Sequence, residues 1–226
     1  EREQEAQRSK EELTELEQAV IGAHFVNMIS GIGRLCYRSN KGMMPVCPYF
    51  LEDDIPDEKQ ATGGSGKSII VKLVVGSAVH VLDVDMKRFV SVTDAKFELG
   101  KLSSEPYKYR VLHWEDKPKA FPMKYFYNMV TSGLTVERKM VDPVTFSAEE
   151  APKSVITCNY PLSDDDDSTV GRFPLVSFSN RFARANPQKR KAARLMSALM
   201  KNFSDKPEEI DDTDRNQAIY ICALAV

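Results

Sequence analysis

The feature that most constrains the fold is residues 61–68, which read Ala-Thr-Gly-Gly-Ser-Gly-Lys-Ser. This segment fits the phosphate-loop pattern G-x-x-x-x-G-K-[ST], except that Ala61 replaces the first glycine. In such a loop, glycines let the backbone N–H groups turn inward around phosphates, and the lysine reaches the terminal phosphates. The serine can give its hydroxyl to Mg²⁺. The segment therefore predicts a site for ATP and Mg²⁺ made by Gly63, Gly64, Ser65, Gly66, Lys67 and Ser68.

The residues that follow this loop favour the same interpretation. Ile69 to Val75 is an apolar run that predicts a short helix ending at Gly76. The positive N-terminal end of that helix would add to phosphate binding. The alternative is a Gly/Ser linker that matches the pattern by accident, but a linker would not run directly into an apolar helix.

Composition sets the broad class of the protein. The chain has 226 residues, which is long enough for one full core with room for a small accessory domain, and its net charge is −2. Because the charge is close to neutral, any site for a polyanion has to be a local basic feature. The four cysteines and three histidines are scattered, which favours a reducing interior and no zinc site.

Location and chain ends follow from what the sequence contains. There is no signal peptide, and the longest apolar stretch, Ile69 to Val84, is interrupted by Lys72 and His80. We therefore expect a cytoplasmic protein. The chain begins without Met, and we expect it to be an excerpt of a longer protein.

Strands and helices are expected to alternate along the chain, which predicts an α/β layered domain. We expect a helix over residues 1–30 that Gly31 and Gly33 break. Strands are expected at 46–51, 78–84, 109–114, 152–159 and 175–178. Helical or loop segments are expected at 92–102, 121–131 and 187–203, a turn or hairpin at 132–139, and acidic loops at 52–60 and 164–167. The predicted organisation is an N-terminal helical collar or linker at 1–45, a core at 46–185 and a C-terminal helical segment at 186–226.

Two pairs of carboxylates are candidates for the metal and the water that ATP hydrolysis needs. Asp83 and Asp85 interrupt an apolar run, which is typical of a partly exposed edge strand. Glu115 and Asp116 follow a strand directly, at the end where open α/β sheets place their ligands. We prefer the second pair, with Glu115 holding Mg²⁺ and Asp116 orienting the water, or the two roles exchanged. A solvated turn before Pro118 is the alternative.

Three further polar features have both a functional and an ordinary interpretation. Asn159 can hold the attacking water or sense the γ-phosphate, or it is a turn residue. Arg172 can bridge γ-phosphate oxygens in a neighbouring subunit, or it pairs with a nearby aspartate. Arg138 and Lys139 can grip nucleic acid, or they are an exposed charge pair on a hairpin.

As an ordered set, these motifs resemble a superfamily 3 helicase domain of the AAA+ class, as found in phages, viruses and mobile elements. The resemblance covers about residues 61–182 and rests on Gly-Gly-Ser-Gly-Lys-Ser, Glu-Asp after a strand, Ser-Gly-Leu-Thr-Val-Glu-Arg-Lys, Pro-Lys-Ser-Val-Ile-Thr-Cys-Asn-Tyr-Pro-Leu and Gly-Arg-Phe. It implies a central parallel sheet flanked by helices. It also implies a hexameric ring that hydrolyses ATP and pulls on single-stranded DNA.

The resemblance assigns a role to each candidate residue. It implies that Lys67 and Ser68 bind phosphate and Mg²⁺, and that Glu115 and Asp116 form the Walker B pair. It further implies that Asn159 is the sensor and that Arg172 is the arginine finger acting on the adjacent subunit. Arg138 and Lys139 would be the cations of the pore. The departures are Ala61 and the two acidic loops, the second of which leaves Arg181 as an alternative finger. The rival functions are an RNA helicase of the same architecture, a nucleotide-switched oligomeric scaffold without unwinding, and a small-molecule phosphotransferase.

Overall fold

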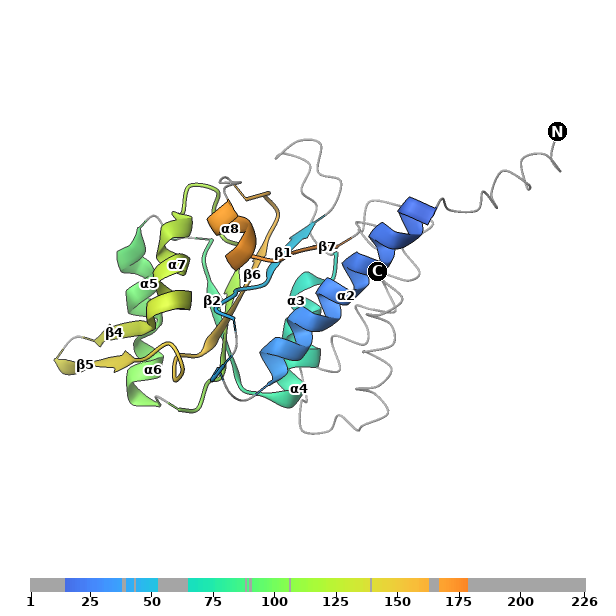
Figure 1. Cartoon of the computed structure of the whole chain (residues 1–226). Coiled ribbons are helices and arrows are strands. Elements are labelled where there is room, and N and C mark those ends of the chain that lie inside the picture. The colour runs from blue at the N-terminus through green and yellow to red at the C-terminus, as the bar shows by residue number, and fades with distance from the viewer. Residues whose placement is uncertain are drawn as a thin grey trace, which may run out of the picture.

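The computed structural model describes residues 15–37, 40–42, 44–52, 65–87, 89, 91–105, 107–138, 140–162 and 167–178 (Figure 1). The helical elements are α2 (Glu15–Cys36), α3 (Lys67–Ile69), the π-helical η2 (Ile70–Val75), α4 (Gly76–Ala78), α5 (Val92–Glu98), α6 (Gly100–Ser104), α7 (Met123–Ser132) and α8 (Asp167–Arg172). The strands are β1 (Tyr49–Glu52), β2 (Val81–Asp85), β3 (Val111–Glu115), β4 (Leu134–Arg138), β5 (Val141–Phe146), β6 (Lys153–Cys158) and β7 (Leu175–Phe178).

Five strands form a central parallel sheet in the order β2-β3-β6-β1-β7. The inner strands β3 and β6 are buried almost throughout, as expected for strands covered on both faces. The strand β2 lies at one edge, where exposed Asp83 and Asp85 alternate with buried Leu82 and Val84. The edge position predicted for this strand from its sequence is confirmed.

Helices cover both faces of the sheet, and each face has its own hydrophobic cluster (Figure 1). On one face α2 and the continuous α3–η2–α4 segment pack against apolar side chains that include Val111 and Val155. On the other face α5, α6 and α7 pack against Leu112, Trp114 and Ile156. Neighbouring residues of one strand point to opposite faces, which explains why consecutive apolar residues are needed there.

The aromatic side chains of the second cluster are tightly interlocked around Trp114. Its ring meets those of Tyr125 and Phe126 edge-on, at centroid separations of 5.8 and 5.3 Å. Its indole N–H donates to the Ser154 hydroxyl at 3.1 Å, so the only polar atom of this buried side chain has a partner. These contacts attach α7 firmly to the middle of the sheet.

The predicted α/β class and all five strand positions are confirmed, but two predicted helix ends are wrong. The helix α2 continues through Gly31 and Gly33 to Cys36, and the helical segment after the loop continues through Gly76 to Ala78. A glycine inside a helix costs only ~1 kcal/mol relative to alanine, so tertiary packing can override it. In α2 that packing comes from buried Met28 and Leu35 on either side of the two glycines.

The turn or hairpin predicted at 132–139 is a hairpin that extends further than predicted: β4 lies within that range, but its antiparallel partner β5 follows it, and the pair projects from the body of the molecule (Figure 1). At its base, Gly133 has a φ of 95°, and a Cβ there would lie 2.2 Å from the Phe146 carbonyl oxygen. Only glycine fits this position. At the tip Met140 is fully exposed and has a φ of 61°.

Several expectations lie outside the described residues. These are the helix at 1–14, the loop 53–64, the acidic residues 163–166 and everything after 178. In the part of the chain that the structure describes, no helix has the length and apolar character needed to cross a membrane.

Candidate functional site

The ammonium group of Lys67 lies where three segments distant in sequence meet. It donates to Asn159 Oδ1 at 2.8 Å, to Glu52 Oε2 at 3.1 Å and to Ser65 Oγ at 3.1 Å. Glu52 is the last residue of β1, and Asn159 directly follows β6, its neighbour in the sheet. The carboxyl ends of parallel strands lie at one edge of a sheet, which is the edge where open α/β folds bind ligands.

This cluster is almost closed to solvent. The side chains of Lys67 and Glu52 are 7% and 2% exposed. Burial lowers the pKa of Lys67, and the charge and hydrogen bond of Glu52 oppose that change. The negative charge of Asp116 makes a smaller contribution that also opposes the effect of burial on the pKa of Lys67.

The loop geometry explains why a glycine stands before Lys67. Gly66 has a φ of 94° and open space where a Cβ would lie, so the backbone conformation and not crowding requires it. From this residue the chain enters the helical segment directly, and the Ile70 N–H donates to the Gly66 carbonyl at 3.2 Å. Ser65 is buried and Ser68 is half-buried, whereas Gly63 and Gly64 lie outside the described residues.

The preferred carboxylates lie at the end of β3, as predicted. Glu115 accepts from Lys72 Nζ, an η2 side chain, at 3.0 and 3.2 Å. Asp116 pairs with Lys87 at 2.9 Å and has a φ of 53°. A non-glycine residue in the left-handed region carries conformational strain, and such residues cluster at functional sites.

The two carboxylate candidates turn out to be neighbours. Asp85 of β2 lies opposite Glu115 in the parallel register, and Asp83 lies opposite His113. The imidazole of His113 is fully buried between Asp83 Oδ1, 2.6 Å from Nδ1, and Thr157 Oγ1, 3.0 Å from Nε2. Burial raises the pKa of Asp83, but the hydrogen bond and charge of His113, together with the charge of Lys72, more than offset this and lower it.

This group of side chains has the composition of a metal site. One ligand atom each from Asp83, His113 and Glu115 lies within 4.8 Å of the others. Carboxylates and an imidazole suit several divalent cations. The Lys72 ammonium already supplies positive charge at Glu115 and lowers the pKa of Asp83, so a metal would compete with it.

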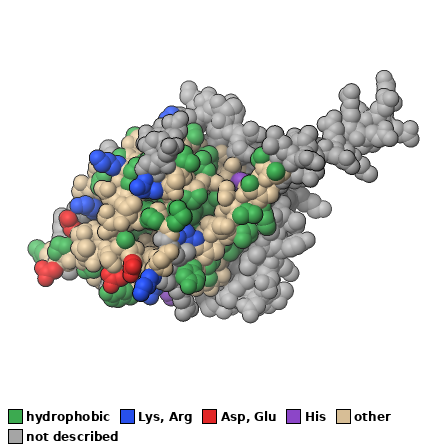
Figure 2. Space-filling view, viewed as in Figure 1, with side chains coloured by type: hydrophobic (Ala, Val, Ile, Leu, Met, Phe, Trp, Pro, Cys, Tyr) green, Lys and Arg blue, Asp and Glu red, His purple; other side chains and the backbone are tan. Residues whose placement is uncertain are grey.

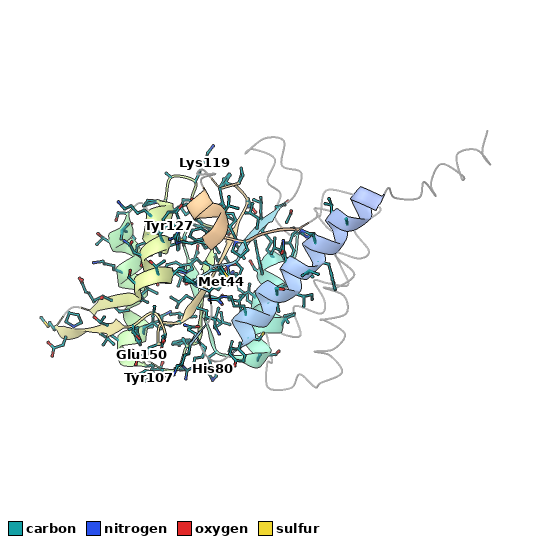
Figure 3. All side chains as sticks on the ribbon, in the orientation of Figure 1. Met44, His80, Tyr107, Lys119, Tyr127 and Glu150 are labelled. Atoms are coloured by element: carbon teal, nitrogen blue, oxygen red, sulfur yellow. The ribbon has the colours of Figure 1, made fainter. Side chains whose placement is uncertain are left out.

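The remaining predicted residues have different surroundings. Arg172 is half-buried at the end of α8, and its guanidinium lies 5.8 Å from the centre of the ring of Tyr127, a residue that Figure 3 labels. Tyr127 comes from α7, and its ring also packs on Phe173 at 5.2 Å. Arg138 ends β4 at the hairpin tip, and its side chain lies outside the described residues, as do Lys139 and Arg181.

Sequence reasoning missed Glu52, His113 and Lys72. Glu52 was expected in an acidic loop, yet it is one of the most buried charged residues of the described chain. The available signal was its place as the first acidic residue after the apolar run of β1, at the same edge as Asn159. The strand register reveals the partner of His113, and the packing of η2 on the sheet reveals that of Lys72.

Comparison with known proteins gives limited information. No protein-family model matches the chain, and no curated protein matches its sequence. Two solved structures of the NrS-1 C-terminal region, in an A-form apo state, are similar to it at 17% and 16% identity, with TM-scores of 0.48 and 0.41. They cover 87% and 89% of this chain, which itself spans 43% and 38% of theirs. A similarity this low carries no argument about function.

Proposed function

We propose that this chain is an AAA+ type ATPase core resembling the superfamily 3 helicases, which hydrolyses ATP to move along single-stranded DNA. The observation that carries the proposal is the position of Lys67. It begins a helix directly after a left-handed glycine and lies between the ends of two adjacent parallel strands, in contact with Asn159. A Gly/Ser linker would produce none of these features.

Each residue of the site has a role in this proposal. Lys67 binds the terminal phosphates of ATP, and Ser68 with Glu115 holds Mg²⁺. Asp116 orients the attacking water, and its charge already acts on Lys67. Asn159, which accepts a hydrogen bond from Lys67 at 2.8 Å, would sense whether a γ-phosphate is present. Bound Mg²⁺ would neutralise charge that develops on the phosphates.

The hairpin is the proposed contact with the strand. The hairpin projects from the body of the molecule (Figure 1), Arg138 is the last residue of β4, and Met140 beyond Lys139 in the sequence is fully exposed. Basic side chains are scattered over the face seen in Figure 2 and do not gather in one patch. A ring, which we propose to be a hexamer, needs only these one or two cations per subunit, because symmetry repeats them around the pore. Arg172 would act on the nucleotide of the neighbouring subunit.

The deciding experiment measures ATP hydrolysis by an assembled sample, with and without single-stranded DNA. We expect strand-stimulated turnover that Lys67→Ala abolishes and that Lys101→Ala, at an exposed residue of α6, leaves unchanged. Turnover without any response to strands would favour a nucleotide-switched scaffold. Stimulation by RNA in place of DNA would identify an RNA helicase.

The hairpin has its own test in the double variant Arg138→Ala, Lys139→Ala. Basal hydrolysis and assembly should persist, since the hairpin is remote from Lys67. Binding to single strands should weaken, and its salt dependence should fall by roughly one phosphate contact per lost cation in each engaged subunit. Unwinding of a forked duplex at the unaltered rate would refute the pore assignment.

A further inference from the structure

A cavity of about 240 Å³ lies at the opposite end of the sheet from Lys67. Its lining includes Lys153 and Ser154 at the start of β6, whereas Asn159 of the nucleotide site follows the end of the same strand. The other walls come from α2, through Arg34, and from the end of α7, through Met129. Asn40 closes one side by donating to the carbonyl oxygens of Ala148 and Ala151, at 3.3 and 2.8 Å.

Lys153 is a buried cation in this wall. It is 7% exposed, and its ammonium donates to the Tyr37 carbonyl and lies 5.7 Å from the centre of the Tyr37 ring. Tyr37 directly follows α2, so this bond satisfies one carbonyl at a helix C-terminus. It uses one of the three N–H donors of the lysine. Lys153 therefore caps the end of α2 with one N–H group, and its other N–H groups can donate to another partner.

A second cation lies beside it. Arg34, in the last turn of α2, has a buried Nε that makes no hydrogen bond. Burial lowers the pKa of Lys153 to about 8, and the charges of Arg34 and Arg110 contribute to that shift. Among the described residues, no carboxylate forms an ion pair with any of these three cations. Glu149 lines the cavity but is exposed.

We propose that this cavity is a binding site for a phosphate-type oxyanion, held by Arg34 and Lys153. Lys153 is a buried charge without a counter-charge among the described residues, so an anion between its ammonium and the Arg34 guanidinium would compensate both charges. The volume is well above the ~10–15 Å³ that one water requires, which leaves room for a phosphate group with part of its hydration. The guanidinium and ammonium groups are the side chains best suited to phosphate oxygens.

The test measures how fast an amine-acylating reagent modifies Lys153 at pH 7, by peptide mass spectrometry, with inorganic phosphate as the probe. An oxyanion bound beside the ammonium raises its pKa, and a rise of one unit reduces the reactive neutral amine about tenfold. We expect phosphate to slow acylation of Lys153 by about that factor and to leave exposed Lys101 unaffected. The wild-type protein is used, and loss of the protection in Arg34→Met separates this cavity from phosphate bound at Lys67.

Two controls define the outcome. Chloride at the same ionic strength should give no protection, and Arg34→Met should abolish it, while Lys124→Met, at an exposed residue of α7, should retain it. A single-stranded oligonucleotide that protects Lys153 at lower concentration than free phosphate would identify a strand backbone as the source of the oxyanion. Equal acylation rates in phosphate and in chloride would overturn the proposal and leave Lys153 as a helix cap only.

Discussion

Replacement of Glu52 by glutamine tests whether the pair between Glu52 and Lys67 is both a structural contact and a competitor of nucleotide. The two side chains are 2% and 7% exposed and 3.1 Å apart, so neither charge is screened by water. Removing one partner of such a buried pair costs ~3–5 kcal/mol, because the other charge is left uncompensated. The amide oxygen of glutamine and the side-chain oxygens of Asn159 and Ser65 can still accept hydrogen bonds from Lys67, so we expect a loss of stability at the lower end of this range.

We therefore expect Glu52→Gln to lower the free energy of unfolding by about 3 kcal/mol in the absence of nucleotide. Phosphate bound by Lys67 has to displace the Glu52 carboxylate, so its removal should also strengthen nucleotide binding. A tenfold tighter Kd for ATP corresponds to about 1.4 kcal/mol and is the change we expect. ATP should consequently stabilise the variant more than the wild type.

The assay is urea unfolding with and without ATP, together with direct measurement of ATP binding. Glu105→Gln is the matched control, because Glu105 also pairs with a lysine, Lys108 at 2.7 Å, but is 47% exposed. An exposed pair of this kind contributes roughly 0–1 kcal/mol. If both variants lose the same stability, or if ATP stabilises Glu52→Gln less than wild type, the reasoning about Lys67 fails.

Three other predictions concern the carboxylates and the subunit interface. Glu115→Gln should stop hydrolysis while ATP binding largely survives, whereas Asp83→Asn should be comparatively mild. The measurements are hydrolysis of radiolabelled ATP and nucleotide binding. If Asp83→Asn stops hydrolysis and Glu115→Gln leaves it intact, the catalytic carboxylate comes from β2 and not from β3. Inactive Lys67→Ala and Arg172→Ala subunits, when mixed, should regain some ATPase activity, and its absence in demonstrably mixed assemblies would disprove the trans role. Because His113 lowers the folded-state pKa of Asp83, that contribution to stability is present above the ordinary aspartate pKa and is lost as pH falls through the lowered one. The difference in unfolding free energy between wild type and Asp83→Asn should therefore shrink on acidification, and a constant difference would contradict the assigned pairing.

The sheet could be predicted from sequence because its strands are short runs of β-branched and aromatic residues separated by polar segments. The edge position of β2 was also readable, since Asp83 and Asp85 interrupt its apolar pattern. Helix ends were less predictable. Gly31, Gly33 and Gly76 are local signals for termination, and packing against the sheet outweighs the small cost of each glycine.

The candidate site was predictable only in part, for a similar reason. Lys67 belongs to a contiguous motif, so its role can be inferred locally. Glu52 and His113 acquire their surroundings from the strand order, which brings β1 beside β6 and β2 beside β3. A carboxylate after a strand looks the same in sequence whether it faces water or a buried lysine, and the register alone separates the two.

The base of the hairpin has a mechanical consequence. Gly133 brings the start of β4 so close to the Phe146 carbonyl that no side chain fits between them, and α7 ends at the residue before it. The strand β4 is also braced by α5 through the pair of Lys96 and Glu137 at 3.2 Å. The arm is therefore connected mechanically, through α7 and the rings of Tyr125 and Phe126 around Trp114, to the strand that ends at Glu115.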